Sequence, residues 1–563
     1  MLPHSGLSAS VPDQEHATAD PVSTTRLSID VRRFPWIRRL VADYAFEYGS
    51  VAEFFAGNPE DPAAWSDSVA RTRRYSRQRG PVADLLQAQQ RRRGAPAEAL
   101  AASELIRDSH TVAVVTGQQA GLFGGPLFTL LKALTAIRLA EQLRAEQGVT
   151  AVAIFWIDAE DHDWDEVKSC GTFDADLNLR TVSVGNPPGA HEGPVARVRL
   201  DASIEDALGG IEALLPRTEF SDTLFESLRR AYGEGVGMAD AFGRWLEAVL
   251  GHRGLIVYDS SDVAAKSLVA GVFAREIETA GETSRLAAEA GTELQARGYH
   301  AQATPQHGSV ALFQLNGGRE AIRVQDGVFT VGDRAETKES LLAQVRQSPA
   351  DFSPNVLLRP LVQDTLFPTV CYVAGPSELA YLAQLRGVYA SFGIPMPLIH
   401  HRATATILDS NSMRFVVRND FPLELLRAQD EAALNDLLAS QLPPTVEGSL
   451  HDALRAVEER MAVLSREVSQ IDPTLEGAAR STLVRMEDDL KKLHAKIIQA
   501  AKRKHETLRR QFRHAQAQAF PGGHPQERTI GMIYFLNKYG PMLVNRLDAE
   551  LPLMMGMHWV VTI

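Results

Sequence analysis

A glycine-rich segment, residues 116–126 (TGQQAGLFGGP), has the residue types of a loop that binds a polar ligand. It lies between a short apolar run, residues 110–115, and the start of a helix predicted over residues 127–147. Glycine lets the backbone approach a ligand closely, and the free N–H groups at a helix start attract anions. The amides of its two glutamines could bind sugar hydroxyls or a carboxylate. The candidate binding residues here are Thr116, Gly117, Gln118, Gln119 and Gly121.

The same segment differs from the standard nucleotide-binding loops. It matches neither GxGxxG nor GxxxxGKS/T, and the nearest lysine, Lys132, lies well inside the predicted helix. The segment is therefore not a standard dinucleotide or P-loop site. The alternative is a tight turn from strand to helix that binds nothing.

An acidic segment, residues 158–166 (DAEDHDWDE), follows a second apolar run, residues 150–157. Seven of its nine residues are Asp, Glu or His, so it could supply a general base or hold Mg²⁺. In an open parallel sheet, the loops after neighbouring strands share the carboxyl edge, where ligands bind. An exposed surface loop is the alternative. The candidate catalytic residues are His162, Asp161 and Asp163, together with Gln118.

A third cluster, residues 353–378, carries a cation among polar side chains. Three of its residues are spaced four apart, which predicts one face of a helix: Asn355, Arg359 and Gln363. The Arg359 guanidinium could clamp a carboxylate or a phosphate through two parallel hydrogen bonds. Ser377 is the predicted N-cap of a helix that runs to residue 392. Glu378 completes the candidate binding residues of this cluster.

The two cysteines, Cys170 and Cys371, are too few for a disulfide scaffold or a four-thiolate zinc site. Cys371 lies in an apolar run and is predicted to be a buried small hydrophobe rather than a nucleophile. Zinc at the acidic segment is disfavoured because His162 is its only histidine. The sequence therefore predicts no protein-bound zinc and no metal ligand set.

The elements that must position these segments form an α/β core. The apolar runs at 110–115 and 150–157 flank the helix at 127–147, which makes one βαβ unit with a right-handed crossover. Further strands are predicted at residues 254–258 and 369–373. The pattern predicts a Rossmann-like parallel sheet. Three short strands with a hairpin turn at Asp326 and Gly327 predict an inserted β subdomain: residues 312–315, 321–324 and 328–331.

The last third of the chain has the spacing of a coiled coil. Apolar residues alternate spacings of four and three from residue 450 to 471 and again from 483 to 500. Pro473 separates the two runs, which predicts an antiparallel helical hairpin arm. An ordinary amphipathic helix pair lying on the core is the alternative.

The net charge and the apolar runs of the chain limit the classes of protein that it can belong to. The chain has 563 residues and a net charge of −12, which argues against a general nucleic-acid binder. Its longest apolar run is too short to span a bilayer, and its start lacks the pattern of a secretory signal, so a cytoplasmic protein is expected. The predicted organisation is a disordered tail (1–25), a helical region packing on the core (26–109), a Rossmann-like core (110–425) with insertions at about 180–250 and 295–350, a coiled-coil arm (426–518) and a segment returning to the core (519–563).

Several motifs, taken in order, resemble those of the BshC family of bacillithiol biosynthesis. They are TGQQAGLFGGPLFTLLKALTAI, FWIDAEDHDWDEV, SPNVLLRPLVQDTLFPTVCYVAGPSELAYLAQL, FGIPMPLI and YFLNKYGPMLVNR. The resemblance covers nearly everything after residue 27. It implies a core similar to class I nucleotidyltransferases, with connecting subdomains and a coiled-coil arm used in dimerisation.

The resemblance also implies an activity, the addition of L-cysteine to glucosaminyl-malate through an amide bond. Activating the cysteine carboxylate would need ATP with Mg²⁺, by way of an adenylate or an acyl phosphate. Arg359 and Arg402 are candidates for binding the malate carboxylates. Asn537, Lys538 and Tyr539 are candidates for a nucleotide pocket near the coiled coil. The implied partners are these small molecules and a second copy of the chain.

Two other functions stay open at this point. A metal-dependent hydrolase could use the acidic segment and His162. A non-catalytic scaffold could bind a sugar acid in the core and dimerise through the arm. The ligase is the leading hypothesis because the motifs occur together and in the order of the family.

Overall fold

The computed structural model describes residues 26–315, 318–440, 442 and 444–563, so the predicted tail lies outside the described residues. At its centre is a five-stranded parallel sheet with the order β13-β12-β2-β3-β6. β3 and β12 are buried along their whole length, as expected for a sheet covered on both faces. The predicted Rossmann-like sheet is confirmed. Its strands are β2 Val112–Gln118, β3 Ala151–Ile157, β6 Ile256–Asp259, β12 Thr369–Ala374 and β13 Leu398–His401.

The order of the strands defines a switch point beside β2. β3 and β6 follow β2 on one side of the sheet, whereas β12 and β13 lie on the other side. Ligands of open α/β sheets bind where the strand order reverses, at the carboxyl ends of the strands. Here that place lies between Gln118, at the end of β2, and Ala374, at the end of β12.

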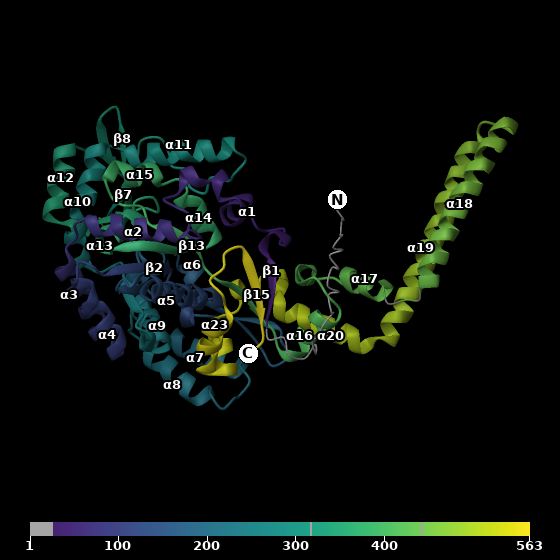
Figure 1. Cartoon of the computed structure of the whole chain (residues 1–563), viewed down its shortest axis with the longest axis horizontal. Coiled ribbons are helices and arrows are strands. Elements are labelled where there is room, and N and C mark those ends of the chain that lie inside the picture. Colours follow the sequence, from purple (N-terminus) through teal and green to yellow (C-terminus); the bar gives the residue numbers. More distant parts are fainter. Residues whose placement is uncertain (1–25, 316–317, 441, 443) are drawn as a thin grey trace, which may run out of the picture.

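Helices cover both faces of this sheet (Figure 1). Alternate residues of β2 enter different cores: Val112 and Val114 belong to one, Ala113 and Val115 to the other. The first core contains α5 Leu127–Gln147 and α9 Met238–Leu250. The second contains α3 Arg79–Arg93, α10 Val263–Thr279 and α13 Arg359–Leu366.

β2 is longer than the sequence predicted, because Thr116, Gly117 and Gln118 continue the ladder with β3. A Cβ at Gly117 would stand 2.8 Å from the carbonyl oxygen of Trp156, so only glycine permits this close pairing. The loop after β2 therefore begins at Gln119 rather than at Thr116.

The predicted inserted β subdomain is confirmed and is larger than expected. It is an antiparallel sheet with the order β10-β9-β8-β7-β11. Asp326 and Gly327 both have positive φ, at 51° and 80°, as a two-residue hairpin turn requires. The strands are β7 Ser309–Leu315, β8 Arg319–Gln325, β9 Val328–Val331, β10 Arg334–Glu336 and β11 Phe352–Pro354.

Further helices and a hairpin complete the body. Among the described residues, no helix is both long and apolar enough to cross a membrane. The elements are α1 Arg39–Phe46, α2 Pro62–Arg74, α4 Ala97–Glu104, α6 Trp164–Val167, β4 Ser169–Phe173, β5 Leu179–Ser183, α7 Ser203–Leu214, α8 Ser221–Ala231, α11 Glu282–Ala296, α12 Lys338–Gln347, α14 Pro376–Leu382, α15 Arg386–Phe392, α16 Ser410–Arg418, α21 Gln526–Thr529, α22 Met532–Tyr539 and α23 Met542–Glu550.

A three-stranded sheet joins distant parts of the chain. β15 Met557–Val561 lies between β1 Arg26–Asp30 and β14 Thr404–Ile407. The prediction of a helical start was wrong for β1. A strand of five residues has little local signal, and the partner of β1 lies more than 500 residues away in the sequence.

The predicted arm is confirmed as two long antiparallel helices, α18 Pro444–Ile471 and α19 Leu475–Lys504. A short turn at Asp472, Pro473 and Thr474 joins them. The hairpin projects away from the body, with α17 Ala432–Ser440 and α20 Glu506–Ala519 at its base (Figure 1). The alternative of a helix pair lying on the core was therefore wrong.

Three histidines of β13 and β15 make stability depend on pH: His400 and His558 are buried and His401 is half-buried. Burial lowers the pKa of His400 and His558 to about 4 and that of His401 to about 3. In the unfolded chain each histidine titrates near its ordinary pKa of about 6.5. Between these values the unfolded chain binds more protons than the folded protein. Above about pH 6.5 the neutral histidines do not lower the free energy of unfolding. As the pH drops toward about 4, they lower it progressively.

We expect the melting temperature to fall between about pH 7 and about pH 5, and the His558→Gln variant to show a smaller fall. The His558 ring contacts the hydroxyls of Thr404 and Thr406, which an amide can also reach. His110→Gln, at an exposed position, is the control and should keep the wild-type pH dependence. Scanning calorimetry measures the difference, and equal pH dependence in His558→Gln and wild type would contradict the assignment.

Candidate functional site

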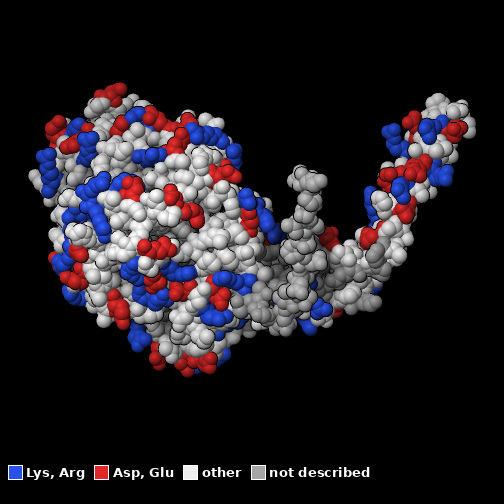
Figure 2. Space-filling model, viewed as in Figure 1, with Lys and Arg blue, Asp and Glu red and all other residues white. Residues whose placement is uncertain are grey.

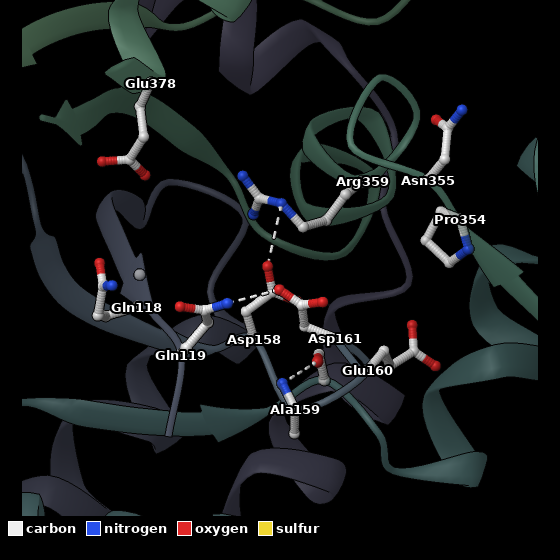
Figure 3. A network of polar contacts seen from close by, with 12 residues as sticks. Gln118, Gln119, Asp158, Ala159, Glu160, Asp161, Pro354, Asn355, Arg359 and Glu378 are labelled. Atoms are coloured by element: carbon white, nitrogen blue, oxygen red, sulfur yellow. Dashed lines mark hydrogen bonds and ion pairs between the residues drawn. The ribbon is translucent and has the colours of Figure 1, made fainter. Parts of the chain in front are cut away.

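A cleft of about 530 Å³ opens at the switch point, over the carboxyl ends of β2 and β12. Its walls come from the loop into α5, the acidic loop after β3, the start of α13 and the turn into α14. In Figure 3, Gln119, Asp158, Asp161 and Arg359 converge from these separate segments. Eight of the predicted site residues line the cleft: Gly117, Gln118, Gln119, Gly121, Asp161, Arg359, Glu378 and Arg402.

Gln119 ties the glycine-rich loop to the acidic loop. Its Nε2 donates to Asp161 Oδ2 at 2.6 Å and to Glu166 Oε2 at 2.9 Å. The loop then turns through Gly124 and Gly125, whose φ values of 91° and 71° favour glycine. The two segments that the sequence placed at one sheet edge are therefore in direct contact.

Arg359 is the first residue of α13 and lies almost fully buried in the wall of the cleft. Its Nε is 3.8 Å from Asp158 Oδ2, and its Nη2 donates to the Tyr381 hydroxyl at 2.8 Å. Burial opposes the positive charge, but Tyr381, Tyr372 and Asp158 keep the pKa of Arg359 above its ordinary value. Burial also raises the pKa of Asp158, and Arg359 counteracts this rise. The cleft wall thus carries the Arg359 guanidinium, which stays positively charged and is oriented by Asp158 and Tyr381.

Lys132 and Glu378 form a buried network at the floor of the cleft. Lys132 Nζ donates to the Gly117 carbonyl at 2.6 Å and lies 2.5 Å from Glu378 Oε2. The Glu378 carboxylate also accepts from the Gly375 N–H and the Tyr372 hydroxyl, both at 2.7 Å. Burial lowers the pKa of Lys132. Burial alone would raise the pKa of Glu378, but the ammonium group of Lys132 has the larger effect and lowers it.

Three details of the third cluster were predicted wrongly. The N-cap of α14 is Gly375, not Ser377, because Pro376 takes the first helical position and Glu378 accepts the Gly375 N–H. Residues 377–392 also form two helices rather than one. α13 begins only at Arg359, so Asn355 precedes the helix and its side chain accepts from the backbone N–H groups of residues 357 and 358.

Three predicted residues close to the cleft do not line it. Thr116 is buried and donates to the Val373 carbonyl at 3.0 Å. Gln363 is buried and donates to Asp364 Oδ1 at 2.9 Å. Asp163 accepts from the Glu166 N–H at 3.1 Å and so serves as the N-cap of α6.

His162 lies outside the cleft lining, with 68% of its side chain exposed. Its Nδ1 is 3.4 Å from Asp161 Oδ1 and 3.4 Å from a terminal nitrogen of Arg319, which belongs to β8. The imidazole is therefore next to a cleft carboxylate and beside the inserted subdomain.

The Asn537–Tyr539 segment lies on α22, and none of its residues lines the cleft. Asn537 is buried, where its Oδ1 accepts from the Ser221 hydroxyl at 2.9 Å and its Nδ2 donates to the Pro216 carbonyl at 2.8 Å. Lys538 lies over the rings of Tyr534 and Tyr539, at 6.0 and 5.2 Å. The structure does not bring these residues together with the predicted core site.

Two arginines close the side of the cleft that faces the C-terminal segment. Arg402 pairs with Glu527 through both terminal nitrogens, at 2.6 and 3.0 Å, and both side chains are buried. Arg528, the next residue on α21, also lines the cleft. Lys132, Asp158 and Arg528 were absent from the predicted site. Lys132 had a usable signal, because helical side chains lean toward the helix start and so toward the loop before α5.

The two cysteines are buried, as predicted, and burial raises the pKa of the Cys170 thiol to about 12 and that of the Cys371 thiol further still. Among the described residues, no three His, Cys, Asp or Glu side chains are grouped to hold a metal ion. The chemistry available in the cleft is instead that of alternating cations and carboxylates, which suits a ligand that carries both charges.

Comparisons with known proteins agree with this architecture. Residues 25–403 match the family "Bacillithiol biosynthesis BshC, N-terminal Rossmann-like domain", and residues 405–563 match "Bacillithiol biosynthesis BshC, C-terminal coiled-coil domain". The chain is 32% identical over 528 residues to a Salinibacter ruber protein, covering 93% of this chain and 96% of the relative. It is 34% identical over 523 residues to a Koribacter versatilis protein, covering 92% and 96%.

Both relatives carry the name "Putative cysteine ligase BshC". The two family matches cover nearly the whole chain and meet between β13 and β14, where the parallel sheet ends. The motifs, the Rossmann-like sheet, the projecting coiled coil and these matches lead to one conclusion: the protein belongs to the BshC family of bacillithiol biosynthesis and is a ligase.

Proposed function

We propose that this ligase joins the carboxyl group of L-cysteine to the amine of glucosaminyl-malate, with ATP, in the last step of bacillithiol biosynthesis. The observation that carries the proposal is the cleft at the switch point, where Arg359 stands between the acidic loop and the Lys132–Glu378 network. Opposite charges in one cleft fit substrates that carry an ammonium group on one side and carboxylates on the other.

The acidic side of the cleft supports the cysteine part of the proposal. Asp158 and Asp161 follow β3 and face the cleft, where they can bind the ammonium group of cysteine. The two protein thiols are buried and stay protonated, so neither competes with the substrate thiol. The malate part would bind on the opposite side, where Arg402 and Arg528 lie.

ATP enters the proposal as a co-substrate, because a free carboxylate does not condense with an amine in water at neutral pH. It would supply the group that turns the cysteine carboxylate into an adenylate or an acyl phosphate. Asp161 and Glu166 would be candidates to hold its Mg²⁺ together with the ATP phosphates, since their carboxylate oxygens lie close together around the Gln119 amide. Gly125 lines the same cleft without a side chain, which leaves room for a phosphate group.

The experiment is deletion of the gene in its own host, followed by thiol analysis by mass spectrometry. The deletion strain should lack bacillithiol and accumulate glucosaminyl-malate, and the wild-type gene should restore the thiol. Continued bacillithiol synthesis without that accumulation would show that the proposal is wrong. Incubation of the purified protein with cysteine, glucosaminyl-malate and ATP then distinguishes the two activated forms, because an adenylate releases AMP and an acyl phosphate releases ADP.

The protein is proposed to act in the cytoplasm as a homodimer formed through the arm. The arm exposes large apolar side chains at helical spacing, which is unusual for a surface that faces water alone. They are Val463, Leu464, Ile471, Leu475, Val484, Met486 and Leu493, each at least 40% exposed.

Charged residues in the arm should therefore break the dimer. We expect the Leu464→Glu/Leu493→Glu variant to sediment as a monomer, because carboxylates would be buried unpaired at the interface. Leu105→Glu replaces an equally exposed leucine of the body and should leave the dimer intact. Analytical ultracentrifugation of the three proteins measures the difference, and a dimeric arm variant would place the interface elsewhere.

A further inference from the structure

Arg528 differs from the other cations of the cleft in having no carboxylate partner. Lys132 pairs with Glu378, Arg359 with Asp158, and Arg402 with Glu527. Among the described residues, no carboxylate lies within ion-pair distance of Arg528, although its side chain is exposed in the cleft. Its guanidinium lies 5.9 Å from the centre of the Phe128 ring. In the part of the chain that the structure describes, the N–H donors of the Arg528 side chain have no hydrogen-bond partner.

The backbone around Arg528 is held firmly against the core. Gln526, two residues earlier, accepts from the Ile407 N–H and donates to the Ile407 carbonyl, both at 2.8 Å. Glu527 accepts from the Ala405 N–H at 3.0 Å in addition to binding Arg402. After Arg528, the Ile530 carbonyl accepts from the Leu127 N–H at 2.9 Å. These contacts fix the start of the Arg528 side chain beside the first turn of α5.

The corner of the cleft at Arg528 carries more positive than negative charge, so it can bind one more anion. Arg402 lies over the same Phe128 ring, at 5.3 Å, so two guanidinium groups share this corner of the cleft. Glu527 uses both of its oxygens on Arg402 and therefore neutralises only one of the two. A ligand carboxylate in the cleft beside Arg528 would gain charge-assisted hydrogen bonds from the planar guanidinium that lines the cleft there.

We propose that Arg528 binds a carboxylate of the malate group, so that the coiled-coil domain supplies a substrate-binding residue to the cleft of the Rossmann-like domain. The identity of that carboxylate rests on the proposed function. The cysteine carboxyl is the reacting group and must stay free to be activated. The malate carboxylates do not react, and a permanent cation is the suitable partner for a charge that stays throughout the reaction.

The test compares Arg528→Gln with Arg528→Lys and with a matched control, Arg427→Gln. Arg427 also lies over an aromatic ring, that of Trp36 at 4.8 Å, but it is outside the cleft. We expect Arg528→Gln to raise the KM for glucosaminyl-malate about 10- to 100-fold with little change in kcat. Arg528→Lys should recover part of the loss because it keeps the charge, and Arg427→Gln should behave as wild type.

Calorimetric titration with glucosaminyl-malate in the absence of ATP and cysteine gives a readout that does not depend on turnover. Arg528→Gln should lose affinity for glucosaminyl-malate, whereas its weaker binding of methyl glucosaminide, which has no carboxylate, should match wild type. If wild type and Arg528→Gln bind glucosaminyl-malate equally, the assignment of Arg528 is wrong and the proposed function stands. If the KM for ATP rises instead, Arg528 binds a phosphate and the assignment is also wrong. If wild type itself binds no glucosaminyl-malate, the proposed substrate is wrong.

Discussion

Replacing Arg359 with methionine is expected to lower kcat/KM by about 10²- to 10³-fold, the usual cost of removing one fixed charge donor from an active site. Arg359 is the buried cation between the acidic loop and the tyrosines of the cleft. Methionine fills similar space without a charge, so the cleft would keep its shape and lose the donor. Arg359→Lys should recover little, because a point charge cannot reach Asp158 and Tyr381 at once.

The variant also leaves Asp158 without its cation, which could lower activity through stability alone. The Arg359→Met/Asp158→Asn double variant tests the effect on stability, because it removes the half-buried Asp158 carboxylate together with its partner. We expect its melting temperature to approach that of wild type. The activity of Arg359→Met is read from the single variant, because Asp158 is itself a proposed cysteine-binding residue. Steady-state kinetics within about tenfold of wild type for Arg359→Met would exclude a substrate role.

Replacing Lys132 with methionine is expected to lower the free energy of unfolding by about 3 kcal/mol. Lys132 is 2% exposed, and its ammonium group lies 2.5 Å from Glu378 Oε2. Without the ammonium group, the Glu378 carboxylate keeps, among the described residues, two hydrogen-bond partners, the Gly375 N–H and the Tyr372 hydroxyl. An unpaired charge at the cleft floor is costly, and protonation of Glu378 would relieve part of this cost.

Thermal and urea unfolding measure the loss, and the Lys132→Met/Glu378→Gln double variant should recover part of it because no charge is then left alone. Lys492→Met removes a lysine that pairs with Asp488 at 2.6 Å on the exposed arm. That variant should have the melting temperature of wild type, since exposed ion pairs contribute little to stability. A Lys132→Met protein as stable as wild type would show that Glu378 is already neutral in the folded protein.

The sheet was predictable because its strands carry their own signal. Buried parallel strands read as short apolar runs, and the rule for ligand sites in open sheets then places the segments after them at one edge. That reasoning brought Gln118, Gln119 and Asp161 to the cleft without any knowledge of distances. It could not detect that β2 continues through Thr116 and Gly117, since pairing with Trp156 and its neighbours decides where the strand ends.

Contacts between distant residues set the rest of the site. Arg402 was predicted as a candidate for binding the malate carboxylates, and the sequence could not show that it pairs with Glu527, on a helix more than 100 residues later. Asn537 looked like a candidate ligand, yet α8 and the loop before it take up its amide. A sequence shows which residues are polar. Only the folded chain shows that Arg402 pairs with Glu527 whereas Arg528 has no carboxylate partner among the described residues.

The position of β15 has a consequence for how the chain is made. β15 is the middle strand of its sheet, and Arg26 in β1 pairs with Val561 near the far end of the sequence. During translation, β1 and β14 leave the ribosome long before the strand that lies between them. Their edges stay open until β15 has been synthesised, and such long-range pairing is slow. The nascent chain therefore depends on β15 to close this sheet, and a chain cut short before β15 would keep two exposed strand edges.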